Sequence, residues 1–303
     1  MYVKRRIFGL CVIALVACDF GTQRNIVFSS DVASVSAVAT DTNAEFMFIG
    51  NGLGQVVQAD PATGAIQGTA GTWAGLNSRV VAMTSDAENN SRVWALHADG
   101  FVVNWAEGPV LTAWFWPPPA AGGPRTFCDL DHASDGDFYL TTLEDDEAVL
   151  WRRDGSTNVW SSTTLGEDTC PRVTHDQLND ELYVLRHGFM FEHRDEDSLA
   201  FEVDFVLDAD GGQIADIDVL GSTVAAAGST GSPNLPPPNG PQPGFNMGWI
   251  YDLATGNVDD AVIIGGAAPS SVHITVNQTA GEPELLIGSL AGTTTVRGRQ
   301  LLP

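Results

Sequence analysis

The stretch that decides the fold is Val80-Val81-Ala82-Met83-Thr84-Ser85-Asp86, an apolar run that ends in an acid. A short polar turn follows it, and then a second apolar run begins at Val93-Trp94. The same order recurs along the chain, and four of the terminal acids follow one another at intervals of 45 residues: Asp41, Asp86, Asp131 and Asp176. Two further copies contain the runs Ile214–Asp218 and Val272–Asn277.

Each copy continues with a third apolar strand and a more variable fourth, and no long segment has helical periodicity. Four short strands in a period of about 40–50 residues are typical of a β-propeller blade. A lone four-stranded sheet exposes its faces, whereas radial packing covers them with neighbouring sheets. We therefore expect an all-β, six-bladed β-propeller of four-stranded antiparallel blades over residues 31–303.

The last copy reaches the C-terminus without an obvious fourth strand. The apolar segment Asn25–Ser29 lies shortly before the first copy and has the composition of a strand. We expect it to supply the missing strand and to close the ring.

The repeats also resemble the bacterial YVTN/NHL/PQQ-like group of propellers. The resemblance rests on the apolar strands that end in an acid and on the turns Asp60–Gly64 and Asp252–Gly256. It covers nearly all of residues 31–303 and implies the fold. It does not imply an activity, because propellers include both enzymes and interaction platforms.

The N-terminus has the pattern of an export signal over residues 1–17. Lys4-Arg5-Arg6 precede an apolar run of eleven residues, Ile7 to Ala17, whereas a membrane span needs about 20. Leu15-Val16-Ala17-Cys18 resembles the lipobox of bacterial lipoproteins. That resemblance implies cleavage before Cys18 and lipidation, including acylation of palmitate type, on this residue.

The lipobox also implies localisation. Residues 18–30 would form a lipidated tether that also contains the closing strand, on an exported protein held at a bacterial cell membrane. Asp19 resembles the inner-membrane retention signal of enteric bacteria, a rule that does not extend to all bacteria, so the choice of membrane stays open. The alternative is a soluble secreted protein in which Cys18 has no such role.

The net charge narrows the classes of binding partner, and the cysteine content predicts a disulfide. The formal net charge of −24 repels nucleic acid and anionic lipid headgroups. Apart from Cys11 and Cys18 in the signal region, the chain has only Cys128 and Cys170, an even pair in an exported protein. We therefore expect a disulfide between them, which would join successive blades.

Six polar residues that do not recur in every copy fall near the predicted axis, and we consider them as a metal site. Alternation along a strand places Asp129 with Asp131, and Asp216 with Asp218, on common faces. Carboxylates bind Ca²⁺ through their oxygens and imidazoles bind a transition metal through nitrogen, and lactonases of the propeller class resemble such an arrangement. The alternative is that these groups form structural networks. The six candidate ligands are Asp129, His132, His175, Asp216, Asp218 and His273.

Trp114, Phe115 and Trp116 precede a proline run and form a candidate partner-binding surface, unless the rings fold back onto the propeller. The chain has no GxSxG, HExxH or Walker motif and so no catalytic residue is assigned. These observations favour a binding or scaffolding module of the cell envelope over an enzyme, with an envelope protein or a small molecule as ligand. The alternative is a metal-dependent hydrolase of the propeller lactonase type.

Overall fold

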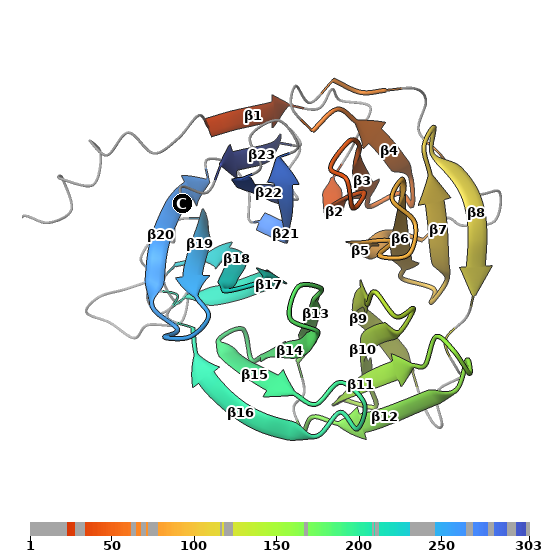
Figure 1. Ribbon diagram of the computed structural model, residues 1–303, viewed down its shortest axis with the longest axis vertical. Helices are drawn as coiled ribbons and strands as arrows, with labels where there is room; N and C mark the ends of the chain where they lie inside the picture. Colours follow the sequence, from red (N-terminus) through yellow and green to blue (C-terminus); the bar gives the residue numbers. More distant parts are fainter. Residues whose placement is uncertain are drawn as a thin grey trace, which may run out of the picture.

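A ring of antiparallel sheets surrounds a central axis in the computed structural model (Figure 1). The structure describes residues 23–27, 34–61, 65–67, 71, 78–115, 117, 124–166, 169–207, 209, 212–230, 246–264, 269–277, 282–289 and 295–300. The predicted signal segment, Cys18, Trp116 and the proline-rich loop 232–244 lie outside these residues. No helix in the described residues is long and apolar enough to cross a membrane.

The strands follow one another outward from the axis within each sheet. The first three sheets along the chain are β2 (Val35–Thr40), β3 (Met47–Asn51) and β4 (Val56–Ala59); β5 (Val80–Ser85), β6 (Arg92–His97), β7 (Val102–Ala106) and β8 (Val110–Phe115); and β9 (Arg125–His132), β10 (Phe138–Glu144), β11 (Glu147–Arg153) and β12 (Trp160–Thr164).

The remaining sheets are β13 (Arg172–Asp176), β14 (Glu181–Arg186), β15 (Met190–Arg194) and β16 (Phe201–Val206); β17 (Gln213–Leu220), β18 (Thr223–Ser229), β19 (Asn246–Asp252) and β20 (Val258–Ile264); and β21 (Pro269–Asn277), β22 (Glu282–Ser289) and β23 (Thr295–Gln300) with β1 (Gln23–Val27).

The β-propeller prediction is confirmed, but the blade count needs a correction. Five sheets have four strands, whereas the sheet β2–β4 has three among the described residues. On its outer edge, β4 pairs with described residues only through two isolated β-bridges, Val56 with Gly71 and Ala59 with Ile66. The expectation of six four-stranded blades is therefore wrong, because the described residues form five four-stranded sheets and one of three strands.

The N-terminal strand closes the ring. β1 pairs antiparallel with β23, with Ile26 opposite Val296, so the last sheet contains strands from both ends of the described chain. The closing strand expected at residues 25–29 forms at Gln23–Val27. This strand lies within residues 18–30, the segment expected to contain both the tether and the closing strand.

The hydrophobic core is divided among the interfaces between neighbouring sheets. Each described cluster joins two adjacent sheets, as where Leu96 of one blade packs with Leu130 and Leu140 of the next. The pleat sends alternate side chains of an inner strand toward the preceding and the following blade. Each sheet thus depends on both neighbours for the burial of its faces.

The terminal acids of the inner strands were expected to occupy one position, and this is true of three of them. Asp41, Asp86 and Asp176 each accept a backbone N–H of the following turn, from Phe46, Glu88 and Leu178 respectively. Ala133 takes the corresponding place in the third copy, where its N–H bonds to the Asp137 carbonyl as the Asp41 N–H bonds to that of Phe46. Asp131 lies two residues earlier, so its interval of 45 residues does not mark the same position.

Candidate functional site

The inner strands are tied to one another by aspartate side chains. Asp129 Oδ2 accepts the backbone N–H of Val173 at 2.9 Å, and Asp131 Oδ2 accepts that of His175 at 2.6 Å. Both bonds run from β9 to β13 of the next blade. An antiparallel ladder cannot join inner strands of different blades, so these side chains supply the connection.

The connection from β17 to β21 repeats this arrangement. Asp216 Oδ2 accepts the Val272 N–H, and Asp218 Oδ2 accepts that of Ile274, each at 2.8 Å, so that β17 is tied to β21. Between β13 and β17 the hydroxyl of Thr174 donates to Asp218 Oδ1 at 3.1 Å and accepts the Val219 N–H at 3.2 Å. Asp129, Asp216 and Asp218 therefore have a structural role that accounts for their place at the axis.

Burial changes the protonation of these acids. Burial and the charge of Asp216 raise the pKa of Asp129, and burial and Asp218 raise that of Asp131. Burial raises the pKa of Asp216 to about 6, although the Arg172 guanidinium opposes the rise. The Arg172 guanidinium opposes the rise in pKa at both Asp129 and Asp216, so its charge stabilises their ionised carboxylates.

His132 does not reach the axis, which corrects its assignment as an axial metal ligand. It follows Asp131 on β9 and therefore points to the opposite face, toward the preceding blade. Its ring lies against Phe138, with centroids 4.3 Å apart, and its Nδ1 accepts the Ala87 N–H at 3.1 Å. Burial lowers the pKa of His132 to about 4, so the ring is neutral at pH 7.

His175 and His273 line the same axial cavity but lie beside different acids. The His175 ring stacks on Tyr139 of the preceding blade, and its Nε2 lies 3.4 Å from both Asp180 Oδ1 and Glu196 Oε2. The His273 Nδ1 lies 2.8 Å from Asp218 Oδ2. Asp129, Asp131, Asp216, Asp218 and His273 meet in a second small axial cavity, but among the described residues no three of the six expected ligands bring their ligand atoms within 4.8 Å of one another.

Two groups of potential metal ligands do form among the described residues. The hydrogen bonding of the histidine in each group argues against a bound metal. In the group Asp86, Glu88 and His132, the imidazole Nδ1 already accepts a backbone N–H. In the group His175, Asp180 and Glu196, the imidazole Nδ1 is buried with no partner. If a metal bound Nε2 of His175, the ring proton would be on Nδ1, which has no acceptor here. Metal-bound histidines usually donate this N–H to a hydrogen-bond acceptor.

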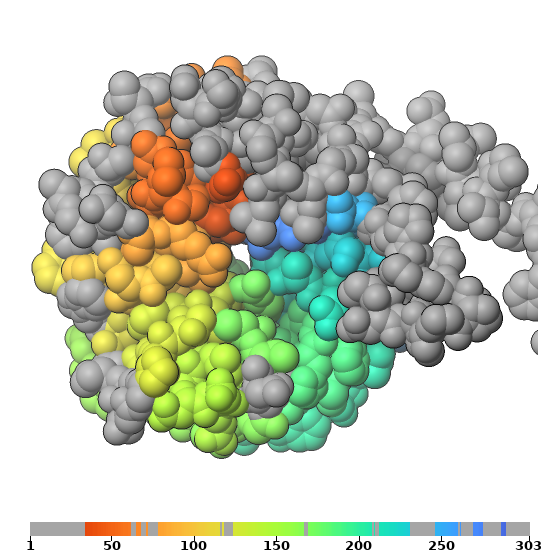
Figure 2. Space-filling view, turned by 180° about the vertical axis from the view of Figure 1, so that it is seen from behind, coloured from red at the N-terminus to blue at the C-terminus, as the bar shows by residue number. Residues whose placement is uncertain are grey.

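The axial channel opens into different cavities at its two ends, and the ring is hollowed near its centre when seen from behind (Figure 2). At the end where the inner strands finish, a cavity of about 100 Å³ is lined by polar groups that include Asp41, Asp131, Asp218 and His273. Where the inner strands begin, a larger cavity of about 260 Å³ is lined by both arginines of that region, Arg79 and Arg172. We call this second cavity the arginine mouth.

β-Bulges shape the arginine mouth. Ser36, Val81, Cys128, Ala215 and Ser270 are the extra residues in β2, β5, β9, β17 and β21, and all five line the cavity. Bulges commonly occur beside functional sites, where they turn backbone groups out of the ladder. No motif in the sequence marks them, and the sequence analysis did not identify this cavity.

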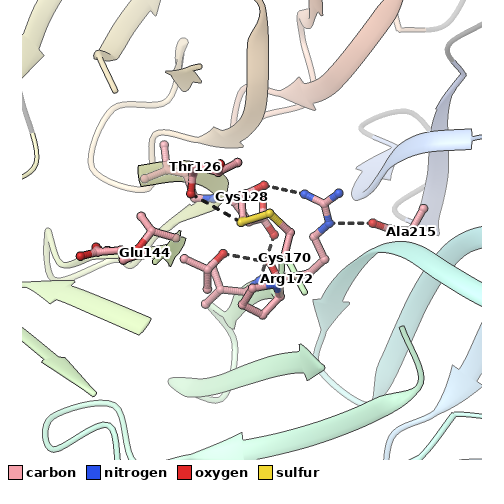
Figure 3. The surroundings of a disulfide bond; sticks show 12 residues. Thr126, Cys128, Glu144, Cys170, Arg172 and Ala215 are labelled. Atoms are coloured by element: carbon pink, nitrogen blue, oxygen red, sulfur yellow. Dashed lines mark hydrogen bonds between the residues drawn. A yellow bond between two sulfur atoms is a disulfide. The ribbon is translucent and has the colours of Figure 1, made fainter. Parts of the chain in front are cut away.

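Arg172 occupies this cavity between three blades. Its Nε donates to the carbonyl of Ala215 at 2.6 Å and its Nη1 to that of Cys128 at 2.5 Å, as Figure 3 shows. Both acceptors are bulge residues, of β17 and β9. The bulges thus expose two carbonyls that hold the guanidinium in place.

The expected disulfide is confirmed and forms part of the same wall. Cys128 and Cys170 are bonded, with Cα atoms 5.3 Å apart, and both line the cavity (Figure 3). The bond joins β9 to the segment that leads into β13. It therefore connects the third and fourth copies and holds the start of the strand that carries Arg172.

The aromatic residues proposed as a partner surface do not form one exposed group. Trp114 lies on the outer strand β8 with 49% of its surface exposed and packs against Phe101. Phe115 points to the other face, where it contacts Trp94 and Phe138. A role in partner binding remains a prediction for Trp114, while Phe115 serves the contact between blades.

The comparisons with known proteins agree on the fold alone. No family model matches the chain, and no curated protein matches it. Among solved structures it is similar to the WD40 domain of Neurospora crassa Pan2, with a TM-score of 0.61 and 12% sequence identity. The match covers 94% of this chain and 98% of that one. At this identity the likeness supports the β-propeller and no particular activity.

The ties between blades lead to a first prediction. Asp131→Ala removes the acceptor of the buried His175 N–H and should lower the free energy of unfolding by about 2 kcal/mol, the usual cost of a buried donor left without a partner. Asp99→Ala, in an exposed turn, should change it by less than about 0.5 kcal/mol. Urea unfolding of both variants measures the difference, and equal stabilities would contradict a structural role for Asp131.

Proposed function

We propose that this protein is a ligand-binding β-propeller of the bacterial cell envelope, tethered to a membrane through lipid on Cys18. The ligand site is the arginine mouth. The observation that carries this proposal is the cavity of about 260 Å³ to which five bulged inner strands contribute. A cavity built from several blades is fixed in shape by the ring, which is the usual condition for a small-molecule site.

The hydrolase alternative has less support from the geometry. A lactonase-type centre needs axial carboxylates that face an ion or a substrate. Here Asp129 and Asp131 each accept N–H groups with both of their oxygens, and so does Asp218 in combination with Thr174. Binding is therefore the function that uses the groups still available at the channel.

The tether is tested at Cys18. The full-length protein, expressed in a bacterium with a lipoprotein pathway, should partition into the detergent phase and carry a diacylglyceryl group on its N-terminal peptide by mass spectrometry. Cys18→Ser should remain unlipidated and move to the aqueous phase, because the thiol that receives the lipid is gone. Aqueous partition of the unaltered protein would refute the tether and leave the binding site untouched.

The binding function is tested by filling the cavity. We expect at least one member of a panel of benzoate, hexanoate, benzamide, hexanol and benzylamine to raise the melting temperature, since a ligand stabilises the folded state it binds. Ala215→Phe places a ring in the arginine mouth and should abolish this rise. Ala113→Phe, on the exposed part of β8, is the matched control and should keep it. A rise that persists in Ala215→Phe, or no rise with any compound, would contradict the proposed site.

A further inference from the structure

We propose that the arginine mouth binds a small organic acid with an apolar body, whose carboxylate is held between Arg172 and Arg79. This inference rests on the proposed binding function and assigns the chemical class of its ligand. The shape, the charge and the hydrogen-bond state of the cavity each point to this class.

The Arg172 side chain is fixed but not saturated. Two backbone carbonyls hold Nε and Nη1, while Nη2 makes no hydrogen bond to the residues that the structure describes. The nearest carboxylate oxygen, Asp216 Oδ1, lies 3.9 Å from Nε, which is beyond hydrogen-bond distance. A guanidinium that is already oriented loses little entropy when it donates to a carboxylate.

Arg79 adds a second positive charge at the same cavity. It precedes β5, is exposed, and lines the arginine mouth together with Arg172. No acidic residue is among the described residues that line this mouth, although the whole chain has a net charge of −24. The opposite end of the channel is lined by Asp41, Asp131 and Asp218, so the linings of the two ends differ in charge, while Asp129 and Asp216 line a smaller cavity to which Arg172 also contributes.

The rest of the wall suits an apolar body. Val80, Val81, Phe127 and Pro269 line the cavity together with the Cys128–Cys170 disulfide. The hydroxyls of Ser36 and Ser270 already donate to backbone carbonyls. The arginines are therefore the main polar groups left for a ligand.

The volume of the cavity suits a small molecule. The cavity of about 260 Å³ is just below the roughly 300–1,000 Å³ that is usual for drug-sized ligands. A monocarboxylic acid with a ring or a short chain fits this volume, and benzoate and hexanoate are suitable probes. A charge-assisted hydrogen bond in such a pocket discriminates strongly against a neutral analogue of the same shape.

The test compares benzoate with benzamide, and hexanoate with hexanol, by titration calorimetry on the full chain. We expect the acids to bind at least tenfold more tightly than the neutral analogues, as one charge-assisted hydrogen bond provides. Arg79→Gln should weaken benzoate binding by about tenfold and leave the melting temperature unchanged, because Arg79 is exposed. Arg92→Gln, which removes the same charge beside the β5–β6 turn, should leave benzoate binding unchanged.

The possible results separate this inference from the function on which it rests. If benzamide or benzylamine binds as tightly as benzoate and Ala215→Phe abolishes that binding, the cavity is a ligand site but not one for acids, and the inference is overturned. Equal benzoate affinity in Arg79→Gln and in the unaltered protein also overturns it. If no probe binds at millimolar concentration, the proposed function fails together with the inference.

Discussion

Hydrogen bonds that aspartate carboxylates accept from backbone N–H groups of the next blade are the interaction that ties β9 to β13 and β17 to β21. Hydrophobic clusters between sheets supply most of the burial, but apolar contact does not fix how far one inner strand slides past another. Asp131 on His175 and Asp218 on Ile274 define that register, because each carboxylate accepts a single N–H from the inner strand of the next blade. Burial, and then the charges of Asp216 and Asp218, raise the pKa values of Asp129 and Asp131, which is the electrostatic consequence of this design.

Structural and candidate binding residues lie at different levels along the axis. Acids in the middle of the channel are engaged by backbone N–H groups, so they are poor candidates for binding an ion. The bulges at the start of the inner strands turn carbonyls toward the axis, and Arg172 binds two of them. The cation that completes this end of the channel is then available to a ligand, and the disulfide of Cys128 fixes the segment that carries it.

Much of the fold was predictable from the sequence because blades repeat. Strand alternation placed Asp129 and Asp131 on one face, and the missing last strand pointed to closure by the N-terminus. The even interval of 45 residues was misleading at Asp131, since turn lengths differ between copies and Ala133 holds the equivalent place. His132 was misplaced for a related reason: its neighbour Asp131 takes the axial face, so the imidazole must point to the other.

The candidate site was not predictable in the same way. Arg172 looks like an ordinary strand residue, and its role depends on bulges at Cys128 and Ala215 that no local motif signals. One clue was present, since the chain has only 14 lysines and arginines and two of them, Arg125 and Arg172, begin inner strands. Rare residues on the inner strands of a repeat protein therefore deserve a search even when no motif includes them.

Amide hydrogen exchange followed by NMR tests the central claim most directly. If side-chain carboxylates hold the inner strands together, the backbone amides of Val173, His175, Val272 and Ile274 should exchange only through global unfolding, as slowly as Leu140 at the centre of β10. Rapid exchange at these four amides, while Leu140 stays protected, would show that the ties between blades are absent in solution and would contradict the account.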